Sequence, residues 1–464
     1  MKNIKTIITV AAMAITATTA SAQNNESGYF VEGNIYRHDL NPAFGNEKNY
    51  IAMPVLGNIN TNMAGNIGIQ DILFNKNGKT TTFLNPLVSK SEFLDGISDN
   101  NNIYEDFHMQ ILGAGFKGFG GYNTVEINVR EIAGVQLPGS LLELAKTGLQ
   151  NKSYDISGLD VSARAWAEIA LGHSRQLNDK WRVGAKFKIL LGGAAADAKF
   201  NNANITLGEN GYTANIDGQV DASVKGLSYK METKSDLKTN DNGNIVAAPD
   251  RKYVNDVDVD GTGLNGFGIA FDLGAEYKID DNWTVSAALR DLGFISWSEN
   301  HVATSGTNVN TADYVFNTDD DAQNSFDNTM DALVDDFAKV YQLQDQGKNS
   351  RTTGIGATME FAGSYKCNFY DKLTFGLLNT TRLMGAHSWT NFRLSANVAP
   401  CKIFSASGTF AVGTYGASLG GVLNLHVTGF NLFLASDHII GKMAKQGVPL
   451  SSNGSVAMGI NFPF

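Results

Sequence analysis

The chain has 464 residues, a formal net charge of −10 and two cysteines. The acidic balance argues against a nucleic-acid partner, and two cysteines are too few for a disulfide scaffold. Charged residues make up 18% of the chain, against roughly 25% in soluble domains, while glycine is 49 residues and proline 8. This composition favours one large β-barrel over several soluble domains.

Residues 1–22 have the form of a secretory signal peptide. Lys2 and Lys5 precede a short apolar stretch, and residues 20–22 form an A-x-A cleavage site, so the mature chain is expected to begin at Gln23. No later apolar run approaches the roughly 18 residues of a transmembrane helix. The sequence therefore predicts export, with the periplasm, the exterior or the outer membrane as the destination.

The mature chain alternates apolar and polar residues, as expected for membrane-barrel strands that face lipid on one side and a lumen on the other. The last strand shows this most clearly, and its terminal aromatic resembles the signal that the barrel-assembly machinery reads. One face of that strand carries Val456, Met458, Ile460, Phe462 and Phe464. A soluble edge strand is the alternative interpretation.

Counting such segments predicts about fourteen strands, centred near residues 60, 112, 127, 167, 187, 270, 290, 359, 378, 395, 407, 422, 435 and 459. Short turns near residues 118–122, 175–180, 279–282, 367–372, 400–401 and 428–429 alternate with longer connections, chiefly 193–262 and 298–350. Outer-membrane barrels have short periplasmic turns and long outer loops. We therefore expect an all-β, antiparallel transmembrane barrel over residues 51–464, located in the cell outer membrane, with residues 23–50 plugging its lumen.

The long connections are expected to carry small structures of their own. A hairpin is predicted around Asn210-Gly211, and a short helix over 138–146. A second helix would place Phe326, Met330, Leu333, Phe337 and Tyr341 on one face. Both helices are interpreted as packing on the barrel mouth, because Asp331, Asp335 and Asp336 would oppose insertion into an anionic membrane surface.

Three motifs suggest chemistry, but their context does not support it. Residues 113–118 match the dinucleotide pattern G-x-G-x-x-G, but a strand follows where a helix is required. Residues 416–420 match G-x-S-x-G without the following helix. The acidic run 256–261 begins like a calcium loop, yet Phe267 stands where a carboxylate is needed. Loose calcium binding by this run stays open, and no enzyme signature, cofactor or metal site is predicted.

Charged residues at lumen-facing positions are the main candidate site. A satisfied salt-bridge network is one interpretation, and a polar path or an anchor for a ligand head group is the other. These residues are Arg164, Glu168, Lys186, Lys188, Asp272, Glu276 and Arg290. Cys367 and Cys401 both fall on short periplasmic turns, where a disulfide is left open because geometry decides it.

Two short stretches carry a resemblance to a known group. Residues 37–44, with Asn41, Pro42 and Ala43 at their centre, and residues 291–297 (DLGFISW) resemble elements of the FadL-like superfamily of outer-membrane barrels. That superfamily includes the long-chain fatty-acid transporters and the barrel shuttle of type IX secretion, and the chain looks closest to an uncharacterised exported family within it. The resemblance implies fourteen strands, a lumen plug that includes Asn41, Pro42 and Ala43, and hydrophobic substrates that enter from outside and leave sideways through the wall.

Three functions are compatible with these patterns. The first is passive transport of a hydrophobic or amphipathic small molecule, with an apolar pocket that Phe326 and Phe337 would supply near the mouth. The second is a non-catalytic scaffold or shuttle for an exported protein partner. The third, a lipid-modifying enzyme, would need a Ser/His pair on one wall. In each case the barrel contacts outer-membrane lipid.

Overall fold

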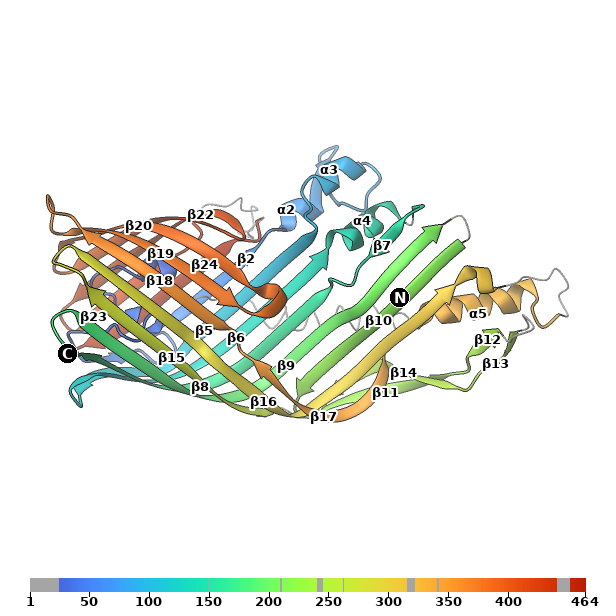
Figure 1. The fold of residues 1–464 in the computed structure, drawn as a ribbon, viewed down its shortest axis with the longest axis horizontal. Coiled ribbons are helices and arrows are strands. Elements are labelled where there is room, and N and C mark those ends of the chain that lie inside the picture. Colours follow the sequence, from blue (N-terminus) through green and yellow to red (C-terminus); the bar gives the residue numbers. More distant parts are fainter. Residues whose placement is uncertain are drawn as a thin grey trace.

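A computed structural model describes residues 25–148, 150–208, 211–239, 245–261, 263–314, 322–339, 342–439 and 451–464. Its main feature is a closed antiparallel β-barrel (Figure 1). The expected signal peptide and Gln23 lie outside the described residues. Among the described residues, no helix is both long and apolar enough to cross a membrane.

The barrel wall has fourteen positions, counted over the described residues, as the sequence predicted. The first position is shared by two short strands, β1 (Tyr50–Ala52) and β2 (Ile59–Gly65), which pair with β5 on one side and with β24 on the other and so close the barrel. The other positions are β5 (Asn100–Gly118), β6 (Gly121–Pro138), β8 (Asp160–Gln176), β9 (Trp181–Gly208), β15 (Gly266–Lys278), β16 (Trp283–Asn310), β18 (Ala357–Lys366), β19 (Leu373–Leu383), β20 (Trp389–Cys401), β21 (Phe404–Gly413), β22 (Gly416–Val427), β23 (Phe430–Ser436) and β24 (Gly454–Pro463).

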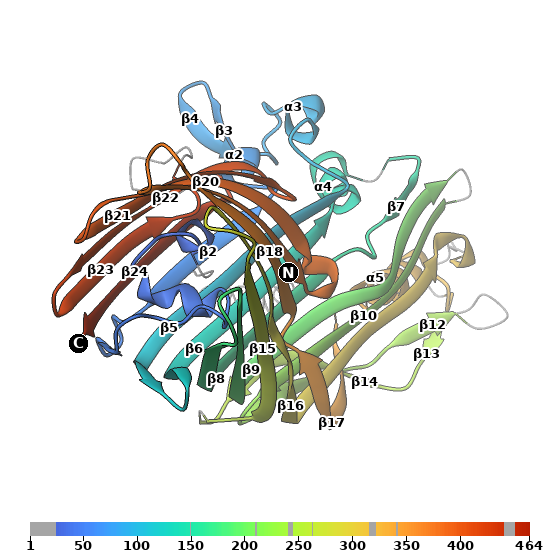
Figure 2. The same cartoon turned by 60° about the vertical axis from the view of Figure 1, so that its left-hand side comes forward.

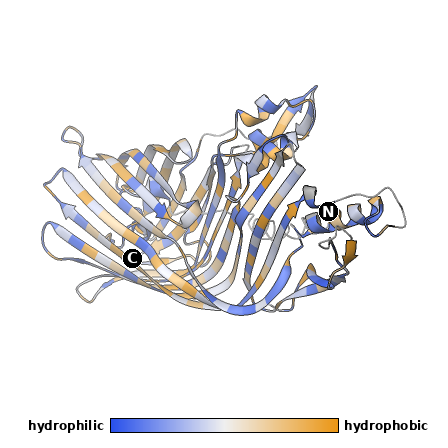
Figure 3. Cartoon of the chain, turned by 45° about the vertical axis from the view of Figure 1, so that its right-hand side comes forward, coloured by the Kyte–Doolittle hydropathy of each residue, from blue (hydrophilic) through white to orange (hydrophobic). Residues whose placement is uncertain are grey.

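The two faces of the wall differ as the alternation predicted. Along β15, Phe267, Phe271 and Leu273 are exposed on the outside, whereas Ala270 and Asp272 are buried on the inside. Hydrophobic and hydrophilic residues alternate along the strands of the wall (Figure 3). A closed barrel satisfies every backbone hydrogen bond of its strands, which is what a bilayer demands. The protein is an outer-membrane barrel.

The turns that the sequence predicted as short lie at one end of the barrel, although the outer end also has short connections at 384–388 and 414–415. The turn between β5 and β6 is only Phe119-Gly120, and both residues have positive φ. The predicted turns at 175–180, 279–282, 367–372 and 428–429 lie at this same end, and the turn predicted at 400–401 falls at 402–403. The chain ends there as well, because the Phe464 amide donates to the Asn49 carbonyl. We take this end as periplasmic.

At the other end, one side of the wall is much taller than the other (Figures 1 and 2). β9 and β16 each have 28 residues, whereas β23 has 7. At about 3.3 Å per residue, 28 residues span roughly 90 Å, far more than a bilayer requires. The segments expected as long outer loops at 193–262 and 298–350 are therefore largely strands.

Two strands extend the tall side in line with barrel strands. β10 (Gly211–Val224) lies between β9 and β16 above the point where β15 begins, and it forms the predicted hairpin with β9. β17 (Gln344–Gly354) continues along β16 above β18. Residues 225–265 therefore form an excursion from the wall. The chain leaves the wall after β10 and returns to it at β15, and both strands lie between β9 and β16. The Asp260 amide donates to the Gly226 carbonyl at the base of this excursion.

Short helices and strand pairs lie at the outer end of the barrel. The excursion holds the pairs β11 (Leu227–Lys234) with β14 (Arg251–Val259) and β12 (Leu237–Thr239) with β13 (Ile245–Ala247). On the other side lie α2 (Ile69–Ile72), β3 (Leu73–Lys76), β4 (Lys79–Thr82), α3 (Lys90–Leu94), α4 (Gly139–Thr147) and β7 (Ser153–Asp155), and short 3₁₀ turns occur at η3 (Thr311–Asp313) and η4 (Gly385–His387). The helix expected over 138–146 is α4.

The second expected helix is α5 (Phe326–Ala338), but its packing was predicted wrongly. Its buried residues include Thr329 and Ala332, whereas Phe326 is 58% exposed, and the helix contacts β12, β13 and β16 rather than the barrel mouth. The side chain of Phe337 and all of Tyr341 lie outside the described residues. Helical periodicity correctly predicted that a helix forms here. It did not predict which face of the helix packs against the outer end of the tall wall.

Candidate site in the barrel lumen

The N-terminal segment, residues 25–49, lies inside the barrel (Figure 2). It contains two 3₁₀ turns, η1 (Glu26–Gly28) and η2 (Ile35–Asp39), and it reaches opposite walls. The Asn431 amide on β23 donates to the Gly33 carbonyl, and the Asn41 amide donates to the Ala287 carbonyl on β16, at 3.2 and 3.3 Å. The segment therefore spans the lumen.

The predicted plug residues 41–43 form a tight turn against the charged side of the wall. The Asn41 side-chain oxygen accepts from the Ala43 amide at 2.9 Å, which closes an Asx turn. Gly184 on β9 and Gly274 on β15 face this turn, and a side chain at either position would collide with Pro42 or Asn41. Glycine at both positions is what allows the backbones to approach.

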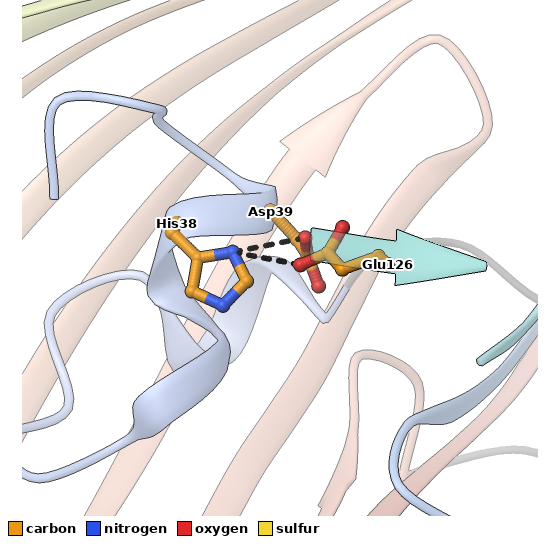
Figure 4. Close-up of side chains that lie close together, drawn as sticks. All are labelled: His38, Asp39 and Glu126. Carbon is orange, nitrogen blue, oxygen red and sulfur yellow. Dashed lines mark ion pairs between the residues drawn. The ribbon is translucent and has the colours of Figure 1, made fainter. Parts of the chain in front are cut away.

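A buried cluster fixes the middle of the segment (Figure 4). His38 Nδ1 lies 3.1 Å from Asp39 Oδ1 and 3.3 Å from Glu126 Oε1 on β6. The Lys186 ammonium on β9 contacts both carboxylates, at 2.8 and 2.9 Å. Among the described residues, His38, Asp39 and Glu126 are the one group whose atoms could hold a metal. Lys186 already supplies the positive charge there, so a lysine-bridged latch describes the cluster better than a metal centre.

A second anchor holds the start of the segment near the outer end. Both carboxylate oxygens of Asp437 accept backbone amides, from Glu26 and Ser27, at 3.0 and 2.8 Å. The Arg393 guanidinium on β20 pairs with Glu26 at 3.2 Å and with Asp437 at 3.4 Å. Arg393 is 2% exposed. Because a buried charge is costly without a partner, this arrangement ties residues 26–27 firmly to the wall.

Asp291 is the centre of the largest charged group. It contacts Lys188 at 2.6 Å, Arg382 at 3.3 Å and Arg130 at 3.6 Å, which come from β9, β19 and β6. Asp291 has a φ of 58° and lies in a β-bulge, where two residues of β16 oppose the single Asp272 of β15. In a regular strand, consecutive side chains point to opposite faces, so only one of Arg290 and Asp291 would face the lumen. Because of the bulge, both side chains face the lumen.

The predicted lumen residues fall into three groups. Glu168, Lys186, Lys188, Asp272 and Arg290 are buried in the lumen, where Arg290 pairs with Glu360 at 2.7 Å and Lys188 with Asp272 at 2.8 Å. Arg164 lies higher and pairs with Asp197, which also holds Arg351. Glu276 lies near the periplasmic end, half-exposed, within electrostatic range of Arg37.

Sequence reasoning missed Asp39, Glu126, Asp291 and Arg393 as members of these networks. Glu126 carried a signal, since it alternates with apolar residues in β6. Asp39 is not in a strand, so no periodicity places it. Asp291 is off the alternation because of the bulge.

An apolar layer lies between the charged group and the outer mouth. Its two largest members, Trp166 on β8 and Trp297 on β16, are buried with Ile132, Leu190, Ile295 and Ile355, and Met384 packs against them. The 291–297 stretch thus has a structural explanation. Asp291 organises the charges, Gly293 has no room for a side chain against Ala270, and Ile295 and Trp297 enter the apolar layer.

The wall is interrupted beside this layer. β19 ends at Leu383, opposite Ala357, while β17 continues upward along β16, with Ile355 and Gly356 at the break. Gly356 has a φ of 78°, which glycine adopts without strain. Among the described residues, β17 therefore has no barrel strand hydrogen-bonded to it on the β19 side.

Four small cavities lie in the described part of the lumen. Each holds about 10 to 40 Å³, enough for single waters but not for a hydrocarbon chain. The two cysteines are both free, with Cys367 buried and Cys401 exposed, so the disulfide left open by the sequence is not formed. In the acidic run, Asp256 and Asp258 flank Lys230, and calcium binding there stays a prediction.

Comparison with known proteins gives a family and several similar folds. The family described as "Family of unknown function (DUF5723)" matches residues 42–437. No curated protein matches the chain. Solved structures similar to it include a Pseudomonas aeruginosa FadL homologue (10% identity, 96% of this chain and 98% of that one, TM-score 0.42) and the Pseudomonas putida toluene transporter TodX (8%, 96% and 94%, 0.39). The Ralstonia pickettii toluene transporter TbuX is another (8%, 91% and 90%, 0.38).

FadL-like proteins, expected from the two motifs, are thus among the structures similar to this chain.

Proposed function

The chain belongs to the DUF5723 family, whose function is unknown, and from its geometry we propose a gated outer-membrane channel for a hydrophobic or amphipathic small molecule. The N-terminal segment is the gate, and Asn41, Pro42 and Ala43 belong to it. The observation that carries the proposal is the apolar layer around Trp166 and Trp297, which lies inside the barrel between the charged group and the outer mouth.

The position of this layer supports a route for a hydrophobic ligand. Below it lies the charged group around Asp291, which a hydrocarbon cannot cross without separating ion pairs. Beside it lies the wall interruption at Ile355-Gly356. A ligand that enters from the outer mouth would therefore rest against the tryptophans and leave sideways into the membrane.

The N-terminal segment fits a gate because few contacts hold it firmly and many hold it weakly. Its firm contacts are the Asp39–Lys186 pair and the Glu26–Arg393 pair. Its contacts with β21 and β23, such as Ser405 to the Glu32 carbonyl, are hydrogen bonds between neutral groups. Releasing one anchor would free half of the segment without disturbing the barrel strands.

A reversible tether tests the gate. Ser27 Oγ lies 2.9 Å from Thr409 Oγ1 on β21, so Ser27→Cys with Thr409→Cys should form a disulfide. Cys367→Ser and Cys401→Ser remove the native thiols from the background. We expect uptake of labelled oleate or toluene into vesicles containing the barrel to fall by about tenfold on oxidation, because the open state is removed, and to recover on reduction.

The single variant Ser27→Cys in the same background is the matched control and should not respond to oxidation. Equal uptake by the oxidised and the reduced double variant would rule out the segment as the gate. Failure of both probes to enter even after reduction would rule out the transport function.

One observation supports the alternative function, a scaffold or shuttle for an exported protein. This observation is the excursion at residues 225–265. Because Gly226 and Asp260 meet at its base, residues 227–259 can be excised by joining these two. If the protein carries an exported partner on this side, the excised variant should lose the partner and keep oleate uptake. Retention of a stoichiometric partner by the excised variant would exclude the excursion as its binding surface.

A further inference from the structure

An apolar hollow lies on the outside of the barrel. It crosses β19 to β22 and has a volume of about 660 Å³. Ala396 on β20 pairs with Gly408 on β21, which pairs with Gly421 on β22. These three outward-facing residues form a row of small side chains that runs across the strands as a floor.

Large residues border this floor. Leu394, Phe410 and Leu419 pair with one another in the next row and form one bank, while Phe375 closes the end on β19. The next row on the other side contains Val398 and Leu423. A side chain built at Gly408 meets nothing within 4 Å, so the hollow is open to the membrane there, whereas the Ile439 side chain borders it at Gly421. Three strand spacings of about 4.8 Å make a groove roughly 14 Å long.

The floor has a firm backing from inside. Gly376 and Gly420 face the lumen at the same level, and side chains there would collide with Phe30 and Ser27 of the N-terminal segment. The segment thus supports this thin part of the wall, and the groove can be filled only from the lipid side.

Charges lie below the β19 end of the groove, at the periplasmic end of the wall. The turn between β18 and β19 carries Lys366 and Lys372, and the turn between β20 and β21 carries Lys402, all exposed, with Asp371 as the one acidic residue in the two turns. The Lys372 ammonium also donates to the Pro400 carbonyl at 2.8 Å, which links the turns. Phe375, at the groove end, is three residues from Lys372.

We propose that this groove is a binding site for one phospholipid of the periplasmic leaflet, with an acyl chain over Ala396, Gly408 and Gly421 and the phosphate beside Lys372 and Lys402. The groove is continuous with the lipid-facing surface of the barrel, it carries no polar side chain on its outer rows, and its charged end matches an anionic head group. The site does not depend on the proposed transport function.

Lipid retention tests the site on the full-length barrel. The protein is stripped in detergent, dioleoylphosphatidylglycerol is returned, and bound lipid is counted by native mass spectrometry. We expect one retained lipid in the unmodified protein. Ala396→Leu with Gly408→Leu fills the floor and should lower retention by about fivefold or more, since the chain loses buried contact area. Gly363→Leu, at another open lipid-facing glycine on β18, is the matched control and should retain the lipid.

The head-group end has its own variant. Lys372→Gln with Lys402→Gln should lower retention about thirtyfold, because two lysines near a membrane surface together contribute roughly 2 kcal/mol to anionic lipid binding. Equal retention in the groove-filled variant and in Gly363→Leu would overturn the site. Unchanged retention in the lysine variant would overturn the phosphate assignment. A dimer lost only in the groove-filled variant would assign the groove to a second copy of the chain instead. Unchanged β-sheet circular dichroism shows that each variant is folded.

Discussion

Two arcs of the barrel wall hold the same N-terminal segment by different kinds of contact. The charged arc, β6 to β20, provides Glu126, Arg130, Lys186, Lys188 and Asp291 among others, most of them buried in ion pairs. The uncharged arc, β2 and β21 to β24, contains no Asp, Glu, Lys or Arg in any strand. It faces the segment with asparagine, serine and threonine.

The difference separates fixed contacts from exchangeable ones. A buried ion pair cannot lose one partner without leaving an unpaired charge, which costs about 3 to 5 kcal/mol. A neutral hydrogen bond contributes only about 1 kcal/mol, and water replaces it readily. The charged arc therefore sets where residues 37–44 sit, while the uncharged arc allows residues 28–34 to move.

The largest expected effect is at the centre of the charged arc. Asp291→Asn keeps a residue that tolerates positive φ but removes the charge that three cations share. We expect the free energy of unfolding to fall by about 3 to 5 kcal/mol in urea titrations of the barrel in vesicles. Asp258→Asn breaks an exposed pair with Lys230 and is the control, with almost no change expected because solvent screens this pair. Equal losses in the two variants would contradict the central role of Asp291.

A second effect tests the latch on the N-terminal segment. Lys186→Met removes the ammonium between Asp39 and Glu126, so two buried carboxylates are left facing each other and His38. We expect residues 25–49 to become sensitive to protease added from the periplasmic side and vesicles to become leaky to small solutes. Protection and leak rates equal to those of the unmodified protein would show that the latch does not hold the segment.

A smaller effect is expected on the uncharged arc. Asn431→Ala removes one hydrogen bond to the Gly33 carbonyl and should cost about 1 kcal/mol of unfolding free energy. Hydrogen exchange at residues 28–34 should rise while exchange at residues 37–44 stays unchanged. Faster exchange over both ranges would mean that the arcs are not independent.

The smallest effect lies outside the barrel. Hydrogen bonds from Lys152 and Lys90 lower the pKa of Glu143 on α4 below its ordinary value of 4.5. A lowered folded-state pKa contributes stability above pH 4.5 that is lost as the pH falls through the lowered pKa. Since the carboxylate is largely solvated, Glu143→Gln should change unfolding by less than about 1 kcal/mol, and only above that pH. A loss that persists at pH 3 would point to packing instead of charge.

The sequence alone determined the barrel. Alternation of apolar and polar residues has a period of two whatever the tertiary contacts, so each strand position, from the one near residue 60 to the one near 459, was readable, and glycine- and aspartate-rich turns marked the periplasmic end. The missing charges of β21 to β24 were also visible in the sequence. Alternation likewise placed Lys186 and Arg290 in the lumen.

Only the tertiary structure decided which residues meet. The bulge at Asp291 places two consecutive charges on one face, and no local rule anticipates it because the second strand, β15, determines the register. β10 and β15 share one line of the wall although some forty residues separate them, so strands were expected as loops. Asp39 and Glu26 are polar residues in irregular segments, and their partners Lys186 and Arg393 lie far along the chain; closing the barrel around the segment is what brings each pair together.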